Sequence, residues 1–224
     1  MCAFEPKLQT LPPSQRRLLP QLEPLQHEGF VLYGGTAVAL RLGHRKSVDF
    51  DFFTSRPLDQ AALVRLLPFL RESTPIQSSA GTFEVLTRER VKVSFFGGLT
   101  MGRVGTPEVT SDGNLLVASL DDLMALKLKV ILQRNEAKDY VDIAAMCRAD
   151  VSVERGLATA EQMFSPTFPP AYALKAMTYF EEGDLENLGP ADREILLKMA
   201  SKVRSLPPVT LKKELIPEPE LPGR

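Results

Sequence analysis

The sequence predicts an α/β (α+β) fold, with a mixed sheet and flanking helices in the first half and helices in the second. Residues 30–53 contain a strand, a Gly-Gly turn, a short helix and another strand. Residues 82–96 add two apolar strands around a polar link. From residue 119 onward the apolar residues keep helical spacing. Strands that alternate with helices before a helical region are typical of this fold class.

The segment 30–53 is the most sharply patterned. FVLY predicts a buried strand, Gly34-Gly35 a turn, TAVALRLG a helix ended by Gly43, and SVDFDFF a second strand. Before it, residues 14–28 predict an amphipathic helix that Pro20 and Pro24 kink or divide into two short pieces.

The remaining elements follow from spacing. A helix is expected over 58–71 with Leu63, Leu66, Leu67 and Leu70 on one face. TFEVLT and VKVSFF predict a hairpin, and extended chain is expected over 106–117. Ser119 is predicted to be the N-cap of a helix that follows it. Further helices are expected over 138–148, 153–163, 170–181 and 190–204. We therefore divide the chain into an α/β core with an N-terminal helix (1–118), a helical half packed on it (119–206) and a Pro-rich, extended or disordered tail (207–224).

Composition fits an ordinary globular protein. The 224 residues are 44% apolar, and 27 basic against 28 acidic residues give a net charge of -1, so charge alone requires no nucleic acid or membrane. Cys2 and Cys147 form neither a disulfide framework nor a zinc-ligand spacing. With no signal-peptide pattern and no run of about 20 apolar residues, we expect a cytoplasmic protein without a membrane partner.

The strongest chemical signal is Asp49 and Asp51, two residues apart in a predicted strand. Side chains alternate along a strand, so both carboxylates emerge from one face. Two like charges at about 4 Å repel by about 4 kcal/mol at an effective dielectric of 20, which favours a bound cation or a shared proton. Mg²⁺, or Mn²⁺, fits because carboxylates and phosphates supply hard oxygen ligands.

An amphipathic strand with two solvent-facing acids is the structural alternative. It is disfavoured because the residues interleaved with the acids, Val48, Phe50, Phe52 and Phe53, are strongly apolar. A turn able to bind phosphate also precedes the strand. Asp49 and Asp51 are therefore predicted to be metal ligands.

That turn is Gly34-Gly35-Thr36, where glycines allow close approach, free N–H groups favour an anion, and Thr36 can donate to a phosphate oxygen. The same residues are also ordinary helix punctuation. A basic run of Arg41, His44, Arg45 and Lys46 lies between the turn and the acids and can neutralise a triphosphate or remain a solvated helix end.

A second polar group lies in LKLKVILQRNEAKDYVDI. Lys127, Arg134, Lys138 and Asp142 share a face if one helix runs unbroken through them, although residues 135–137 can interrupt it. Asp139 lies beside Lys138. As surface residues these side chains would only make weak pairs along the helix.

FVLYGGTAVALRLGHRKSVDFDFF resembles the start of the AbiEii/AbiGii-type nucleotidyltransferase toxin family, within the DNA polymerase β-like nucleotidyltransferase superfamily. The resemblance continues through Lys127, Arg134 and Lys138-Asp139-Tyr140-Val141-Asp142 and the segment FPPAYALKAMTYFEEGDLENL, and so covers about residues 30–188.

The resemblance implies a mixed sheet with flanking helices, Mg²⁺ on Asp49 and Asp51, and transfer of a nucleoside monophosphate with loss of pyrophosphate. It also implies that Gly35 and Thr36 bind triphosphate, and that Lys127 with Asp139 or Asp142 completes the site. Gly34, Arg45, Lys46 and Arg134 are the further expected nucleotide-binding residues. The acceptor would be RNA or protein, and the partner a cognate antitoxin.

One departure concerns a third carboxylate that many polymerase β-like enzymes carry on a neighbouring strand. Ser94 stands at the plausible position, and the facing of Glu84 depends on the hairpin register. Either Asp139 or Asp142 replaces this ligand, or activity has been lost. The competing hypothesis is therefore a non-catalytic nucleotide-binding or regulatory protein on the same fold.

Overall fold

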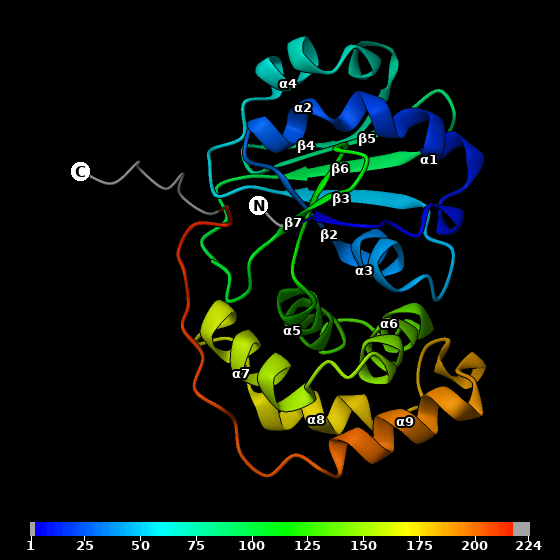
Figure 1. Ribbon diagram of the computed structural model, residues 1–224, viewed down its shortest axis with the longest axis vertical. Helices are drawn as coiled ribbons and strands as arrows, with labels where there is room; N and C mark the ends of the chain where they lie inside the picture. Colours follow the sequence, from blue (N-terminus) through cyan, green and yellow to red (C-terminus); the bar gives the residue numbers. More distant parts are fainter. Residues whose placement is uncertain (1–2, 217–224) are drawn as a thin grey trace.

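The computed structural model describes residues 3–216 (Figure 1). Its strands are β1 Ala3–Phe4, β2 Val31–Tyr33, β3 Asp49–Phe53, β4 Thr74–Ser78, β5 Thr82–Leu86, β6 Lys92–Phe96, β7 Glu108–Thr110 and β8 Leu116–Val117. They form an 8-stranded mixed sheet in the order β1-β7-β8-β2-β3-β6-β5-β4. The predicted fold class is confirmed: the sheet belongs to the N-terminal part and the region after it is helical.

The middle of the sheet is built from β2, β3 and β6. β3 runs antiparallel to β2 and parallel to β6. Phe50 and Phe52 on one face of β3 are fully buried, and Phe52 stacks on Phe95 of β6 with ring centroids 5.8 Å apart. Because side chains alternate, Asp49 and Asp51 emerge from the opposite face.

The apolar face is covered by short helices, α1 Pro13–Leu18, α2 Pro24–His27 and α4 Gln60–Leu66, together with the 3₁₀ turns η2 Leu19–Leu22 and η3 Pro68–Glu72. A further 3₁₀ turn, η1 Leu8–Thr10, precedes α1. The division of 14–28 into short pieces is confirmed, whereas a single helix over 58–71 is wrong. Pro68 interrupts it because proline lacks the N–H that a continuing helix needs.

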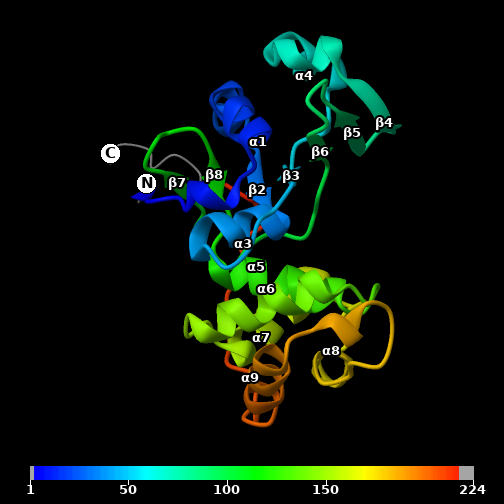
Figure 2. The ribbon, with the colours of Figure 1, turned by 90° about the vertical axis from the view of Figure 1, so that its right-hand side faces the viewer.

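The polar face carries α3 Gly34–Leu42 and, beyond it, the helical half (residues 119–206). That half contains α5 Leu120–Val130, α6 Ala137–Arg148, α7 Val153–Phe164, α8 Pro170–Met177, the 3₁₀ turn η4 Leu185–Asn187 and α9 Pro190–Ala200. Figure 2 shows α5 and α6 next to α3, with α7, α8 and α9 farther from the sheet. α3, which belongs to the sheet half (residues 3–118), therefore lies between the sheet itself and the helical half.

Helix ends follow the local sequence. Ser119 caps α5 as predicted, its hydroxyl accepting a hydrogen bond from the Asp122 backbone N–H at 3.2 Å. Residues 131–136 separate α5 from α6, so the unbroken helix through Lys127 and Asp142 does not form. Within residues 3–216, every helix falls short of the length and apolarity that a bilayer crossing requires.

Two strands were not anticipated from the sequence. β4 has the sequence TPIQS, whose residues are all exposed at the edge of the sheet, and Pro75 disrupts the usual strand pattern. β1 contains only two residues, Ala3 and Phe4, and pairs in parallel with β7.

The chain after α9 returns to the sheet half. Arg103 and Lys212 exchange two backbone hydrogen bonds, each 2.8 Å long, and Leu215 is buried. Residues 207–216 contain no helix or named strand, and the rest of the predicted tail, like Cys2, lies outside the described residues.

The close packing of α7 on α5 generates a stability prediction. A side-chain carbon added at buried Gly156 would overlap Met124 and lie 3.3 Å from Leu128. We expect Gly156→Val to lower the free energy of unfolding by about 1–3 kcal/mol through overpacking, measured by urea denaturation. Gln162→Val, on the exposed face of the same helix, is the control. Equal midpoints for the two variants would contradict the packing argument.

Candidate functional site

A charged cavity of about 170 Å³ lies between the polar face of the sheet and the helical half. Residues from α3, the loop before β3, β3, β6, α5, the loop between α5 and α6, and the start of α6 meet there. They are Gly35, Arg45, Lys46, Ser47, Val48, Asp49, Asp51, Lys92, Lys127, Arg134 and Lys138. Positive side chains thus surround a pair of carboxylates.

Asp49 and Asp51 stand side by side along β3 at the cavity. Burial and the neighbouring charge of Asp49 raise the pKa of Asp51, while the positive charges of Lys92 and Lys127 oppose this rise. A buried carboxylate with a raised pKa is one whose ionised form lacks full compensation by the protein. The pair is therefore chemically suited to an added cation.

The Gly-Gly bend packs directly against these carboxylates. Gly34 has a φ of +73°, and a side-chain carbon on it would overlap the Asp51 carboxylate. A carbon on Gly35 would overlap the Arg45 guanidinium and lie 3.4 Å from Asp142 Oδ2. Glycine is required at both positions, first by backbone conformation and then by close approach.

Lys127, which lines the cavity, is held in place by two buried acids. Its Nζ lies 2.6 Å from Asp139 Oδ1 and 2.6 Å from Asp142 Oδ2. The lysine is 4% exposed, and both aspartates are 0% exposed. The interruption between α5 and α6, one of the two arrangements that the sequence left open, brings these residues together by helix packing.

Asp142 also contacts two side chains from the loop before β3. His44 Nε2 lies 2.7 Å from Asp142 Oδ1, and the Arg45 guanidinium donates to both carboxylate oxygens at 2.6 and 2.9 Å. Burial alone would raise the pKa of Asp142, but the charge of Lys127 and the hydrogen bonds from His44 and Arg45 outweigh it. They hold that pKa well below its usual range.

The negative charge of Asp139 is also compensated by basic neighbours. Burial opposes ionisation, but Lys127 and Arg134 together lower the pKa of Asp139. Arg134 Nε lies 2.8 Å from Asp139 Oδ2. Neither Asp139 nor Asp142 lines the cavity, so the expectation that one of them replaces a missing metal ligand is not supported: both orient basic side chains instead.

The basic residues before β3 do not all reach the cavity. Arg45 and Lys46 line the cavity. Arg41 turns away, donates to the Val117 and Ala118 carbonyls and pairs with Glu108 at 2.6 Å. Lys138 lines the cavity and pairs with Glu136 at 2.7 Å.

Thr36 does not match the expected phosphate contact. It is 1% exposed, and its hydroxyl is engaged with the Asp49 backbone carbonyl and, at 2.8 Å, with the Ser47 hydroxyl. The threonine therefore fixes the start of β3 beneath the glycine bend. Sequence alone could not separate this role from phosphate binding because both use the same hydroxyl at the same helix start.

The hairpin register settles the facing of Glu84. Asp51 pairs with Ser94, and Ser94 pairs with Glu84, so all three emerge on the polar face. Lys92, which the sequence analysis did not single out, is the register partner of Asp49 and lines the cavity. Its position two residues before Ser94, in a strand beside the acidic strand, is the signal that could have found it.

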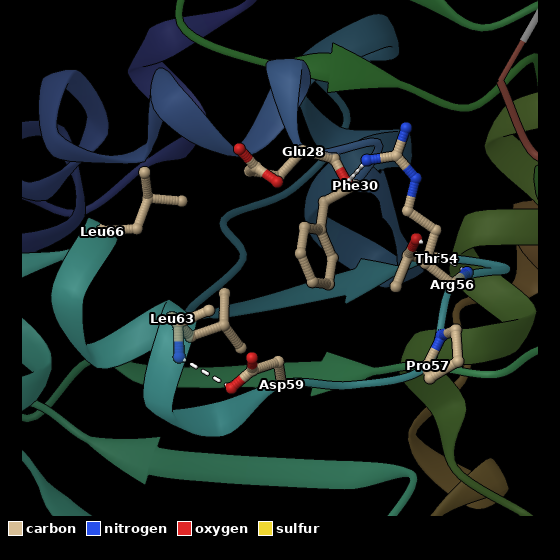
Figure 3. A pocket seen from close by; sticks show the side chains of 9 residues that line it. Glu28, Phe30, Thr54, Arg56, Pro57, Asp59, Leu63 and Leu66 are labelled. Atoms are coloured by element: carbon tan, nitrogen blue, oxygen red, sulfur yellow. Dashed lines mark hydrogen bonds between the residues drawn. The ribbon is translucent and has the colours of Figure 1, made fainter.

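Another cavity, of about 180 Å³, lies near the other end of β3 (Figure 3). Phe30, Leu63 and Leu66 give it an apolar wall. Two of its polar side chains have structural partners: Asp59 caps α4 by accepting from the Ala62 N–H at 2.8 Å, and Arg56 donates to the Glu28 backbone carbonyl at 3.2 Å. The apolar wall distinguishes this cavity from the charged one.

The buried pairing of Asp142 predicts an acid-dependent stability. Its pKa is depressed in the folded state from a usual 3.8, so its stabilising contribution is complete above that pH and is lost as pH falls toward the folded value. Asp142→Asn should lower unfolding free energy at pH 7 by about 3–5 kcal/mol, because Lys127 and Arg45 lose a buried partner.

The variant should also lose less of its remaining stability than the parent between pH 5 and pH 3, measured by denaturant unfolding at each pH. Glu161→Gln, on the exposed face of α7, is the control and should leave the profile unchanged. Parallel pH profiles for Asp142→Asn and the parent protein would refute the assignment.

Comparison with known proteins agrees with this architecture. The family profile described as "Nucleotidyl transferase AbiEii toxin, Type IV TA system" matches residues 17–209. MenT4, a nucleotidyltransferase toxin from Mycobacterium tuberculosis H37Rv, has a similar structure, with a TM-score of 0.54 at 12% identity, over 85% of this chain and 82% of that one. The antibiotic-resistance factor ANT(2'')-Ia gives a TM-score of 0.52 at 14% identity, over 66% of this chain and 89% of that one. At these identities, the likeness concerns the fold.

An uncharacterized protein of Aquifex aeolicus (strain VF5) is 33% identical over 121 residues, which are 53% of this chain and 58% of that relative. The match therefore spans less than two thirds of the relative's length. The profile, by contrast, covers most of the chain, including the glycine bend, the paired aspartates and the Lys127 network. The chain belongs to the AbiEii nucleotidyl transferase toxin family of type IV toxin–antitoxin systems.

Proposed function

We propose that this protein transfers a nucleoside monophosphate from a nucleoside triphosphate to an RNA or protein acceptor, using Mg²⁺ or Mn²⁺. In this proposal, Asp49 and Asp51 hold the metal. The protein acts as the toxin of a pair, with a cognate antitoxin as its partner.

The observation that carries the proposal is the pairing of the cavity's charges. Arg45, Lys127 and Arg134 bind the buried pair Asp139 and Asp142, which lie outside the cavity. Lys92 binds Glu84 and Lys138 binds Glu136. Asp49 and Asp51 form no ion pair with a described residue, so their charge is available to an added cation.

The donor set fits a hard divalent ion. Within residues 3–216, no group of three or more His, Cys, Asp or Glu side chains is placed to hold a metal. Mg²⁺ is commonly bound by one or two carboxylates together with substrate phosphates and water, so two aspartates are sufficient protein ligands. When bound, the ion would polarise the phosphates and neutralise charge that develops in transfer.

The chain's own residues would position the triphosphate. The N-terminus of α3 presents backbone N–H groups at Gly35, which favours an anion there. Lys127, fixed by Asp139 and Asp142, supplies a buried positive charge at the cavity wall. Arg45 and Arg134 are held at its edges by the same two acids and add positive charge.

Transfer would move the α-phosphoryl group to an acceptor oxygen while pyrophosphate leaves. Fixed positive groups aimed at this phosphate need no reorganisation as charge develops, which makes electrostatic stabilisation their main contribution. Their rigidity comes from the buried aspartates behind them.

The alternative function is nucleotide binding without turnover, and Ser94 is the feature that favours it. Both functions predict nucleotide binding, but only the first predicts product. Calorimetry with Mg²⁺ and each nucleoside triphosphate, run beside a transfer assay, separates them. Binding without transferred label would support the alternative.

The central prediction concerns Asp49. We expect Asp49→Asn to reduce transfer of labelled nucleotide to acceptors in a cell extract by about 100-fold or more, because a charged group at the reacting phosphates is lost. Removing divalent ions with a chelator should abolish transfer. Asp112→Asn, in the exposed turn between β7 and β8, is the control. Transfer by Asp49→Asn at the control's rate would refute the proposal.

The glycine bend gives a separate prediction. Gly35→Ala should displace Arg45 and narrow the approach to the α3 N-terminus, because the added carbon overlaps the guanidinium. We expect the KM for the triphosphate to rise about 10-fold or more, the size of effect expected when a charged hydrogen bond is lost. Steady-state kinetics measure it, with Gly189→Ala at the start of α9 as the control. An unchanged KM would show that the triphosphate does not approach this bend.

A further inference from the structure

The polar face of the sheet lacks a third carboxylate where a second metal ion would need one. Ser94 is the register partner of Asp51, is 0% exposed, and offers Asp51 a hydroxyl group where a further metal ligand would have to be a carboxylate. Glu84 stands in the same row on β5, one strand farther out. With neighbouring strands about 4.8 Å apart, Glu84 lies about 10 Å across the sheet from Asp51.

Glu84 has a different partner. Its Oε2 lies 3.1 Å from Lys92 Nζ, and its side chain is 13% exposed against 37% for the lysine. Lys92 is the register partner of Asp49 and lines the charged cavity. The acid is thus the more buried member of the pair and anchors a lysine that reaches the cavity.

Lys92 differs in origin from the other cations of the cavity. Among the described lining residues, Lys127, Arg134 and Lys138 come from the helical half, and Arg45 and Lys46 come from the loop before β3. Lys92 alone rises from the sheet that carries the paired aspartates. Its ammonium is therefore on the same surface as the two carboxylates, on the side of the acid-bearing strand where Ser94 lies.

A second divalent ion is disfavoured at such a position. Its protein carboxylates would be the two that it shares with the first ion, because the side chain of Ser94 is a hydroxyl and cannot supply a third. A fixed positive charge would also lie beside it. An ammonium group, by contrast, needs no carboxylate cage. It can meet negative charge on a phosphate or acceptor oxygen directly.

We propose that Lys92, positioned by Glu84, takes the place of a second metal ion, so that Asp49 and Asp51 bind a single divalent ion with the nucleotide. Lys92 is the catalytic cation on the sheet side of the transferred phosphoryl group. Glu84 is a positioning residue that acts through it. This inference rests on the proposed function and adds a cation to that same site.

The metal count is the first test. Purified full-length protein is titrated with Mn²⁺ at saturating non-hydrolysable nucleoside triphosphate analogue, and free Mn²⁺ is measured by electron paramagnetic resonance. We expect one bound ion per chain. Two bound ions in the parent protein would overturn the inference.

The second test separates Lys92 from metal binding. Lys92→Met should lower kcat by about 100-fold, with the Mn²⁺ affinity of the analogue complex unchanged or stronger, because a repelling charge is removed. Glu84→Gln should lower kcat less, and Glu84→Asp should restore part of it. Arg88→Met, which removes an exposed cation of the same hairpin, should change neither quantity. A full kcat for Lys92→Met would refute the assignment.

A rebuilt site gives the converse test. The double variant Lys92→Met with Ser94→Asp exchanges the lysine for a carboxylate beside Asp51, and its thermal unfolding is checked first. If it folds, we expect two bound Mn²⁺ ions; a single ion would contradict the charge argument. If it does not fold, the Lys92→Met kinetics and the parent metal count still decide.

Failure of this inference is distinguishable from failure of the proposed function. A parent protein that transfers nucleotide but binds two ions overturns only the role of Lys92. A parent protein that binds neither Mn²⁺ nor the analogue, and transfers nothing, overturns the proposed function and the inference with it.

Discussion

The arrangement of this molecule depends on the buried contact between Lys127 and the aspartates 139 and 142. This cluster joins α5 to α6, and through Arg45 it also joins the helical half to the loop before β3. Charges buried this deeply are stable only when each has close partners. The two halves are consequently fixed relative to one another at the point where the cavity forms.

The cluster also explains how a cavity rich in positive charge coexists with two aspartates that form no ion pair within residues 3–216. Acids behind the cavity wall hold the basic side chains in place, so these side chains do not collapse onto Asp49 and Asp51. Supporting residues of this kind keep reactive groups in position without contacting a substrate themselves. Asp139 and Asp142 are buried as structural residues are, yet they determine the electrostatics of the site through the basic side chains that they hold.

Local sequence was sufficient for much of the fold. The β5–β6 hairpin follows from alternating apolar residues, and the end of α3 follows from Gly43, which has a φ of +73°. β4 was missed because an exposed edge strand carries no alternating pattern. The break at Pro68 shows that apolar spacing persists across a residue that interrupts the helix.

Part of the candidate site could likewise be predicted from local sequence, and part depends on how distant segments pack. The Asp49–Asp51 pair and the glycine bend are adjacent in sequence, so strand and turn geometry alone place them together. The contact of Lys127 with Asp142 depends on how α5 packs on α6, which no local pattern fixes. Thr36 was assigned to phosphate because an inward hydroxyl and an outward one have the same sequence signature. Lys92 gains its significance only from a strand register that pairs it with Asp49.

The return of the chain from α9 to Arg103 has a topological consequence. The helical half is continuous with the sheet half at residue 118 and is bound to it again where Lys212 meets Arg103. A swing of the helical half about residue 118 would therefore have to extend residues 201–211, which contain no helix or named strand, or separate the Lys212 backbone from Arg103.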